Sequence, residues 1–173
     1  VVGKEKLRQI TEPASTDVFA YVDGSEDEIA QRAILEMTPG FGVMFVHFPK
    51  GDLAGHSYGW LGQAQLAAYR EGDAAFGKLL AGLDFAGMRS TTLIIITSDH
   101  GEEFGEHGGM GHGRSLYPEV LRVPLVIAAP GLLAPTQVTT PTSLLDVTPT
   151  VLDLLGLEPI PGQRGVSLLG RAH

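Results

Sequence analysis

The feature that most limits the fold is a short, almost wholly apolar run from Thr91 to Thr97, Thr-Thr-Leu-Ile-Ile-Ile-Thr. A strand that is apolar on both faces is typical of a parallel sheet covered by helices on both sides. Further strand patterns occur at residues 17–22, 41–48 and 123–131. Helical periodicity appears between them, so the sequence predicts an α/β fold with a mostly parallel sheet.

Three segments have the pattern of helices. Ser25 precedes a helix-forming run, and Glu28 completes a capping box for a helix over residues 25–37. A second helix is predicted between residues 61 and 83, where apolar residues recur at helical spacing, namely Leu66, Tyr69, Phe76, Leu80 and Leu83. Farther along, Thr148 is predicted to cap a third helix, with Pro149 in its first position and Gly156 just past its end.

Composition excludes several classes of protein. The chain has 173 residues, of which 43% are hydrophobic and 18% charged, and no convincing linker, so residues 1–173 are predicted to form a single partial domain. The net charge of -8 argues against a nucleic-acid partner. No apolar run approaches the length of about 20 residues that crosses a bilayer, so no membrane-spanning segment is expected. The chain has no cysteine, so a bound metal must be held by nitrogen and oxygen ligands.

Two polar segments follow predicted strands, at residues 49–60 and 97–114. Residues 96–113 read ITSDHGEEFGEHGGMGHG and contain three histidines, four carboxylates and six glycines. In open α/β sheets, ligands bind beyond the carboxyl ends of the strands, where the loops converge. We therefore expect these two loops to meet above the sheet and to form one site.

The residue types in the two loops point to metal binding. Asp52 and His56 flank a short glycine-containing stretch, interpreted as a loop that turns an oxygen and a nitrogen toward one point. His112 is predicted to be the third ligand, leaving a position open for water or substrate. Asp99 and His100 are predicted to serve a second cation about 4 Å from the first. Each residue alone could be a cap or turn residue, but their joint placement favours metal ligation.

The other polar residues of these segments have plainer interpretations. His47 is predicted to be a packed residue at a strand end, and His107 a loop histidine. The acidic residues Glu102, Glu103 and Glu106 are predicted to form a solvated turn, with contacts to the histidines as the alternative.

Two longer stretches resemble a known family. Residues 92–131, TLIIITSDHGEEFGEHGGMGHGRSLYPEVLRVPLVIAAPG, with LLDVTPTVLDLLGL at 144–157 and GVSLLG at 165–170, resemble the carboxyl-terminal half of the sulfatase and phosphodiesterase branch of the alkaline phosphatase superfamily. Residues 52–56, DLAGH, are similar to the D-x-x-G-H loop of its nucleotide pyrophosphatase/phosphodiesterase and cofactor-independent phosphoglycerate mutase members. The resemblance implies a three-layer sandwich of the alkaline phosphatase type.

The resemblance also implies roles for individual residues. Asp52, His56 and His112 match positions that bind one metal in those families, and Asp99 and His100 match positions that help to bind the other. The families also use an early aspartate and a Ser or Thr nucleophile, or a formylglycine within C-x-P-S-R. Neither motif occurs here, so we expect the chain to be the carboxyl-terminal part of a longer enzyme and to be inactive alone.

The predicted function is metal-dependent hydrolysis of a small-molecule phosphate ester. Imidazole ligands suit zinc, or manganese as an alternative, better than the calcium of sulfatases, whose ligands are carboxylate and amide oxygens. Two cations are expected to stabilise the attacking and leaving oxygens. The alternatives are a sulfatase acting on a sulfate ester, which would need an upstream formylglycine motif, and a metal-binding module without catalysis.

Overall fold

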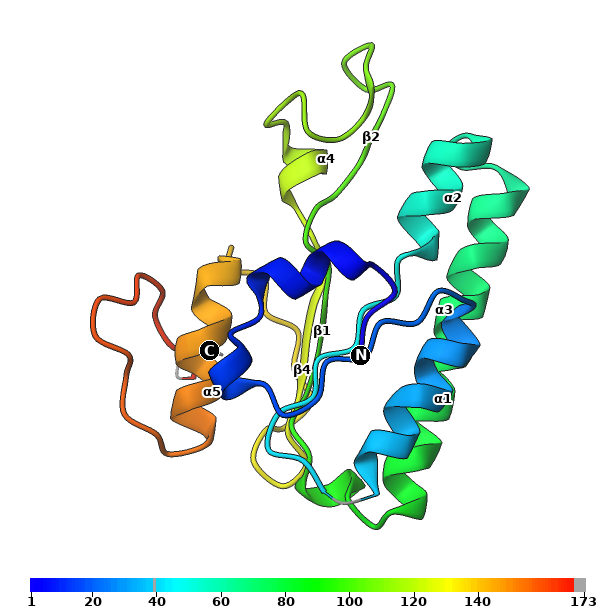
Figure 1. The fold of residues 1–173 in the computed structure, drawn as a ribbon. Helices are drawn as coiled ribbons and strands as arrows, with labels where there is room; N and C mark the ends of the chain where they lie inside the picture. The colour runs from blue at the N-terminus through cyan, green and yellow to red at the C-terminus, as the bar shows by residue number, and fades with distance from the viewer. Residues whose placement is uncertain (39, 170–173) are drawn as a thin grey trace. The chain divides into compact units, whose positions relative to one another are not determined.

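The computed structural model describes residues 1–38 and 40–169, and the chain divides into two compact units, Val1–Ile127 and Ala128–His173. The elements of the first unit are drawn in Figure 1; its helices are α1 (Glu26–Met37), α2 (Lys50–Tyr58), α3 (Gln63–Phe85) and α4 (Pro118–Leu121). Its strands are β1 (Ile94–Thr97), β2 (Glu103–Phe104), β3 (Met110–Gly111) and all but the last residue of β4 (Leu125–Ala128). Among the described residues no helix is both long and apolar enough to span a bilayer.

The start of α1 follows from its sequence. The Ser25 side chain accepts a hydrogen bond from the backbone N–H of Glu28, and the Glu28 carboxylate accepts one from the Ser25 N–H at 2.6 Å. This capping box satisfies two N–H groups that would otherwise lack partners at the helix end. The predicted helix and its cap are therefore confirmed.

The core of the first unit lies between α1 and α3. Buried apolar residues of both helices form it, namely Ala30, Ala33, Met37, Ala75, Leu79 and Leu83. The small alanines allow close approach, and α2 packs against the same long helix (Figure 1). Gly87, with φ of 68°, ends α3: the Met88 N–H reaches back to the Leu83 carbonyl at 2.8 Å. The helix predicted between residues 61 and 83 is confirmed, with bounds shifted by two residues at each end.

The strands are shorter than predicted, and the mostly parallel sheet is not confirmed. Strands β1 and β4 are neighbours in a two-stranded sheet, and β2 pairs antiparallel with β3. Residues 17–22 and 41–48 form no strand of their own. They join the chain start through single parallel bridges of Val2 to Tyr21 and of Val2 to His47. The bridging segment Val1–Gly3 makes hydrogen bonds over only three residues, so neither ladder extends beyond one bridge.

The second unit contains the helix α5 (Val147–Leu154), which follows the 3-10 turn Leu144–Asp146. The prediction that Thr148 caps this helix is wrong. Ser143 and Asp146 form a capping box for the preceding turn, so the chain becomes helical before Thr148. The predicted end is confirmed, because Gly156, with φ of 64°, follows the last turn and the Leu157 N–H bonds back to the Leu152 carbonyl.

Candidate metal and active site

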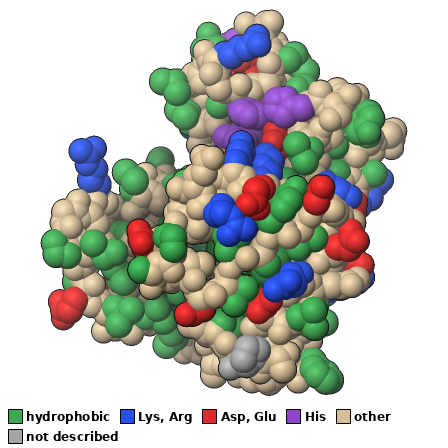
Figure 2. Space-filling view, in the orientation of Figure 1, with side chains coloured by type: hydrophobic (Ala, Val, Ile, Leu, Met, Phe, Trp, Pro, Cys, Tyr) green, Lys and Arg blue, Asp and Glu red, His purple; other side chains and the backbone are tan. Residues whose placement is uncertain are grey.

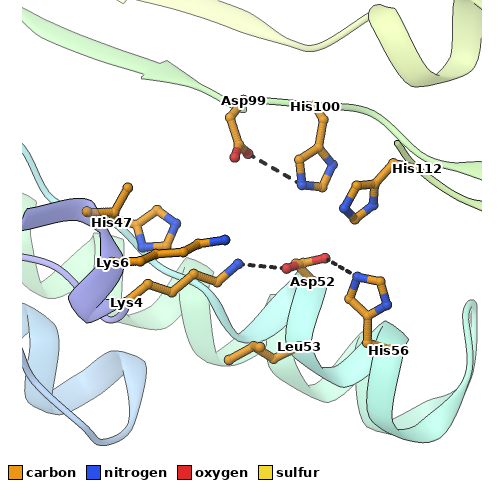
Figure 3. A pocket seen from close by; sticks show the side chains of 10 residues that line it. Lys4, Lys6, His47, Asp52, Leu53, His56, Asp99, His100 and His112 are labelled. Atoms are coloured by element: carbon orange, nitrogen blue, oxygen red, sulfur yellow. Dashed lines mark hydrogen bonds and ion pairs between the residues drawn. The ribbon is translucent and has the colours of Figure 1, made fainter. Parts of the chain in front are cut away.

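A cavity of about 480 Å³ in the first unit is lined by all five residues predicted to bind metal, namely Asp52, His56, Asp99, His100 and His112. Figure 2 shows histidine side chains gathered on this face with basic side chains (Lys or Arg) beside them. In the close view, Asp52 and His56 project from α2, and Asp99, His100 and His112 point toward them from the opposite wall (Figure 3). The two segments predicted to meet therefore do meet.

Asp52 and His56 lie on a helix, so the predicted loop at residues 49–60 is wrong in its local structure. The glycines that suggested a loop serve close packing. A Cβ on Gly51 would lie 2.6 Å from Cε1 of Tyr69, and one on Gly55 only 2.2 Å from Cζ3 of Trp60. Because residues four apart share one face of a helix, α2 presents Asp52 and His56 to the cavity together.

Helix α2 is held at its first turn by a carboxylate from α1. The Lys50 N–H donates to Oε1 of Glu26 at 2.7 Å, and the Lys50 ammonium lies 3.1 Å from Oε1 of Glu71 in α3. Burial disfavours the ionised form of Glu26 and raises the pKa of its carboxyl, although the hydrogen bond from Lys50 opposes this. Glu26 thus fixes the start of the helix that carries Asp52.

The Asp52 carboxylate has two different neighbours. Oδ2 accepts a hydrogen bond from the Lys4 ammonium at 2.7 Å, and Oδ1 lies 3.1 Å from Nε2 of His56. Burial disfavours the charge, but the hydrogen bond and charge of Lys4, with the charges of His56 and His112, outweigh burial and lower the pKa of Asp52. Asp52 is therefore a carboxylate at neutral pH, as a metal ligand must be.

The opposite wall is built by the turn after β1. Ser98 Oγ donates to the His100 carbonyl at 2.9 Å, and the N–H of Gly101 donates to the Val120 carbonyl at 2.7 Å. A Cβ on Gly101 would lie 2.0 Å from the Glu119 carbonyl oxygen, so only glycine allows this approach to α4. The turn places Asp99 and His100 at the cavity.

His112 follows the β2–β3 hairpin, in which Glu103 pairs with Gly111 and Phe104 with Met110. Its Nδ1 lies 3.0 Å from Oε2 of Glu102, and its ring stacks on that of His100 with centroids 3.7 Å apart. The hairpin therefore returns His112 to the wall that carries His100.

The donor atoms of Asp52, His56 and His112 all lie within 4.8 Å of one another, as do those of His100, Glu102 and His112. Asp99 belongs to neither group: its side chain is 81% exposed and its Oδ1 lies 3.7 Å from Nε2 of His100. The geometric convergence predicted for the first three residues is present. Metal ligation by the five residues stays a prediction.

The donor set of the first group fits a divalent cation. Asp52 Oδ1 is buried and has no hydrogen-bond partner among the described residues, although His56 Nε2 is only 3.1 Å away. An unpartnered buried carboxylate oxygen is costly, and a cation held jointly with the imidazoles would satisfy it. One oxygen and two nitrogens with space for a further ligand match the ligand types that zinc uses in catalytic sites.

The acidic residues after His100 are not simply a solvated turn. Glu103 is 5% exposed and accepts hydrogen bonds from the Gly109 N–H at 3.0 Å and from Ser115 Oγ at 3.2 Å. The solvated interpretation is wrong for Glu103 and for Glu102, whose side chain is 11% exposed. It holds for Glu106, which is exposed and accepts from the Phe104 N–H. Glu102 instead makes the alternative contact that was predicted, to a histidine, namely His112.

Two remaining histidines behave differently from each other. His47 is half-buried and lines the cavity, where burial first and the Lys4 charge second lower the pKa of its imidazole. It is a packed residue that forms the bridge to Val2, in keeping with the prediction, but it also lines the cavity. His107 lies 2.9 Å from the Glu119 carboxylate and stacks on Tyr117, away from the cavity lining.

Sequence reasoning missed Lys4, Lys6 and Leu7, which also line the cavity. The one sequence signal for the lysines was their place shortly after the apolar pair Val1–Val2. A strand pattern of two residues is too short to predict that these side chains reach a strand-end site.

The sequence profile of the Sulfatase family matches residues 56–157. The chain belongs to the sulfatase family. The match begins at His56 and includes the SDHG turn and His112, so the resemblance to the sulfatase branch of the alkaline phosphatase superfamily is confirmed.

Curated relatives of this sulfatase-family chain carry sulfatase names. It is 38% identical to arylsulfatase K of Mus musculus over 99 residues, which are 57% of this chain and 18% of that protein. It is 44% identical to choline-sulfatase of Rhizobium meliloti (strain 1021) over 100 residues, covering 56% of this chain and 19% of the relative. The chain thus spans about a fifth of the length of the curated relatives it matches.

Solved structures agree with the family. The phosphonate monoester hydrolase of Silicibacter pomeroyi is 27% identical with a TM-score of 0.57, covering 97% of this chain and 34% of that one. A 2-O GAG sulfatase, BT1596, is 25% identical with a TM-score of 0.55, covering 63% and 24% of the two chains. These neighbours support the predicted partial alkaline-phosphatase-like domain, although the short strands of this chain do not confirm its sheet.

Proposed function

We propose that this chain supplies the metal-binding wall of a hydrolase that cleaves esters of a tetrahedral anion, with a phosphate or phosphonate ester as the substrate. The observation that carries the proposal is the convergence of Asp52, His56 and His112 within 4.8 Å, in a cavity also lined by Asp99 and His100. Two cations are proposed, zinc foremost and manganese as the alternative. Calcium is disfavoured because imidazole nitrogens are poor ligands for it.

Each residue has a proposed task. Asp52, His56 and His112 would hold one cation, and Asp99 with His100 would contribute to the second. Bound cations would supply charge stabilisation to the ester oxygens and lower the pKa of a bound water. Lys4 and Lys6 add positive charge at the same cavity, in a chain whose net charge is -8. The bound cations and these lysines together would therefore attract an anionic ester to this cavity.

The nucleophile is proposed to come from outside these 173 residues. The residues that line the cavity include no Ser, Thr or Tyr among those that the structure describes, and the sequence contains no cysteine. Hydroxyl and thiol groups are the usual nucleophiles of covalent ester hydrolysis. We therefore expect the 173-residue chain to bind metal and the anionic group, but to hydrolyse esters only feebly.

Charge favours a phosphate ester over a sulfate ester as the substrate. A phosphate monoester carries up to two negative charges, whereas a phosphonate monoester and a sulfate monoester each carry one, and the proposed site combines two cations with two lysines. The phosphonate monoester hydrolase similar to 97% of this chain supports the same choice. The second candidate is a sulfatase, favoured by the names of the relatives that are 38% and 44% identical.

The test combines metal and anion binding on the 173-residue chain. Zinc is titrated by calorimetry into wild type, His56→Ala and the control His107→Ala, whose imidazole lies outside the cavity lining. Inorganic phosphate and sulfate are then titrated into the zinc-loaded chain. We expect zinc binding that only the His56 substitution weakens, and phosphate binding at least tenfold tighter than sulfate.

The possible results separate the alternatives. Sulfate binding tighter than phosphate would favour the sulfatase, and zinc binding without either anion would favour a metal-binding module without catalysis. Absence of zinc binding would overturn the proposal. Robust turnover of bis-(p-nitrophenyl) phosphate by the chain would contradict the assignment of the nucleophile to residues outside it.

A further inference from the structure

Glu102 makes a contact that the proposed ligand set leaves unexplained. Its Oε2 lies 3.0 Å from Nδ1 of His112, and the two side chains are 11% and 23% exposed. Its other oxygen, Oε1, is buried and has no hydrogen-bond partner among the described residues. A carboxylate held this far from water is costly unless a partner stabilises its charge.

We propose that Glu102 is a positioning residue that fixes the tautomer and the ring orientation of His112. A neutral imidazole carries one proton, on either Nδ1 or Nε2, and an ionised carboxylate can only accept. The contact with Glu102 therefore places the proton on Nδ1 and leaves the lone pair on Nε2. That nitrogen is then free to share a cation with Asp52 and His56, so the inference rests on the proposed function.

The backbone around Glu102 is fixed independently of His112. The Glu102 N–H donates to the Glu119 carbonyl at 2.9 Å, and the preceding Gly101 N–H donates to the Val120 carbonyl at 2.7 Å. Both acceptors belong to α4, so the position of Glu102 is set by that helix. A carboxylate whose backbone is held by α4 can therefore orient the ring of His112, which comes from the other strand of the β2–β3 hairpin.

A second contact restricts the His112 ring from its face. The His100 ring stacks on it with centroids 3.7 Å apart and planes 23° apart. Stacking limits tilting of the ring but allows a rotation about Cβ–Cγ that exchanges the positions of Nδ1 and Cδ2. The hydrogen bond to Glu102 is the contact that distinguishes the two nitrogens, so loss of Glu102 should scramble the tautomers even where the ring stays in place.

Glu102 also lies within 4.8 Å of the donor atoms of His100 and His112, so direct ligation is the competing role. One neutral imidazole offers a single lone pair. If Nδ1 served a cation with Glu102, Nε2 would carry the proton and could not serve Asp52 and His56. The two roles therefore predict opposite tautomers of His112 in the zinc-loaded chain.

The experiment measures the His112 tautomer by ¹⁵N NMR of the metal-free chain and of the zinc-loaded chain at pH 8, with the signals assigned by their absence in His112→Ala. Zinc affinity is measured by competition with a chelator. Variants are Glu102→Ala, Glu102→Gln and the control Glu106→Ala, an exposed carboxylate of the same segment. We expect Nδ1–H in the wild type both without and with zinc, a mixture in metal-free Glu102→Ala, and zinc affinity about 10- to 100-fold lower in that variant.

The glutamine variant separates positioning from ligation. Its side-chain carbonyl can still accept from Nδ1–H, so Glu102→Gln should keep the Nδ1–H tautomer and lose zinc affinity only several-fold. Nε2–H in the wild type, or an unchanged tautomer and zinc affinity in Glu102→Ala, would overturn the proposal. A tautomer change in Glu102→Ala with no zinc binding by the wild type would leave Glu102 as a positioning residue and reject the proposed function instead. If Glu102→Ala does not fold, the His112 tautomer in the Glu102→Gln spectrum tests the positioning role instead, with Nδ1–H as the expected result.

Discussion

The Lys4 ammonium lies 2.7 Å from Oδ2 of Asp52, although 48 residues separate the two in sequence. Both side chains are 20% exposed, so the pair is only partly screened by water. The contact puts a fixed positive charge beside the carboxylate that we propose as a metal ligand. Lys4 should therefore oppose cation binding and favour anion binding at one cavity.

Replacing Lys4 by Ala should change the two affinities in opposite directions. A unit charge about 4 Å from a divalent cation costs about 2 kcal/mol in a water-like medium, so zinc should bind about 30-fold tighter. Phosphate should bind the zinc-loaded variant more weakly by a similar factor. Calorimetry of both ligands checks this, with Lys78→Ala, which removes the exposed partner of Asp27, as the control. Weaker zinc binding in Lys4→Ala would mean that Lys4 supports the metal site.

The single tryptophan offers a direct readout of His56 and His112. The Trp60 ring centroid lies 5.1 Å from that of His56 and 6.4 Å from that of His112. Zinc binding by these imidazoles should therefore change the Trp60 fluorescence. His112→Ala should reduce zinc affinity at least tenfold and abolish the change at concentrations that saturate the wild type. The same titration on His107→Ala should match wild type; an equal loss there would show that zinc binds elsewhere.

Local sequence patterns predicted the parts of the fold that depend on local contacts. The capping box of Ser25 and Glu28 and the apolar spacing of α3 needed only neighbouring residues, and both helices form. The site residues were found because strand ends in α/β proteins converge. Lys4 could not be predicted in the same way, because its contact with Asp52 is long-range.

Glycines misled the prediction where tertiary packing, and not a turn, requires them. Gly51 and Gly55 suggested a loop, yet both lie in α2, where the rings of Tyr69 and Trp60 occupy the space of a Cβ. A glycine required by packing and a glycine required by a turn look identical in one sequence. Similarly, Glu103 looked solvated because its partners Gly109 and Ser115 come from the far side of the hairpin.

The packing role of Gly55 predicts a sign reversal between two glycine substitutions. Alanine normally stabilises a helix interior by up to about 1 kcal/mol relative to glycine. Gly55→Ala should instead destabilise the chain by about 1–3 kcal/mol, because the new Cβ would lie 2.2 Å from Trp60. Gly77→Ala in α3, where no atom lies within 4 Å of the added Cβ, should stabilise it. Urea unfolding measures both, and a stabilised Gly55→Ala would contradict the packing argument.

Burial of Glu103 predicts a structural cost for its removal. Glu103→Ala would leave the Gly109 N–H and the Ser115 hydroxyl without their acceptor, at a cost of about 1–3 kcal/mol. The control is Glu106→Ala, since Glu106 is exposed. Thermal unfolding should show a lower midpoint only for the first variant. Equal unfolding midpoints for the two variants would mean that Glu103 behaves as a solvated residue, as its sequence context suggests.

Glu26 predicts a stability that depends on pH. Burial raises the pKa of its carboxyl above 4.5, with the Lys50 hydrogen bond and charge opposing, so the folded chain holds this proton more tightly than the unfolded chain. The contribution of Glu26 is therefore most favourable below pH 4.5 and is lost as pH rises through the folded-state pKa.

The variant Glu26→Gln tests this pH dependence. It removes the buried charge, while its side-chain carbonyl can still accept the hydrogen bond that the Lys50 N–H donates to Oε1 of Glu26 at 2.7 Å in the wild type. Its unfolding midpoint should exceed that of wild type at pH 8, and the difference should disappear toward pH 4. Glu12→Gln, an exposed control, should follow wild type throughout. A lower midpoint for Glu26→Gln at pH 8 would mean that the charge of Glu26, through Lys50, contributes more to holding α2 than its burial costs.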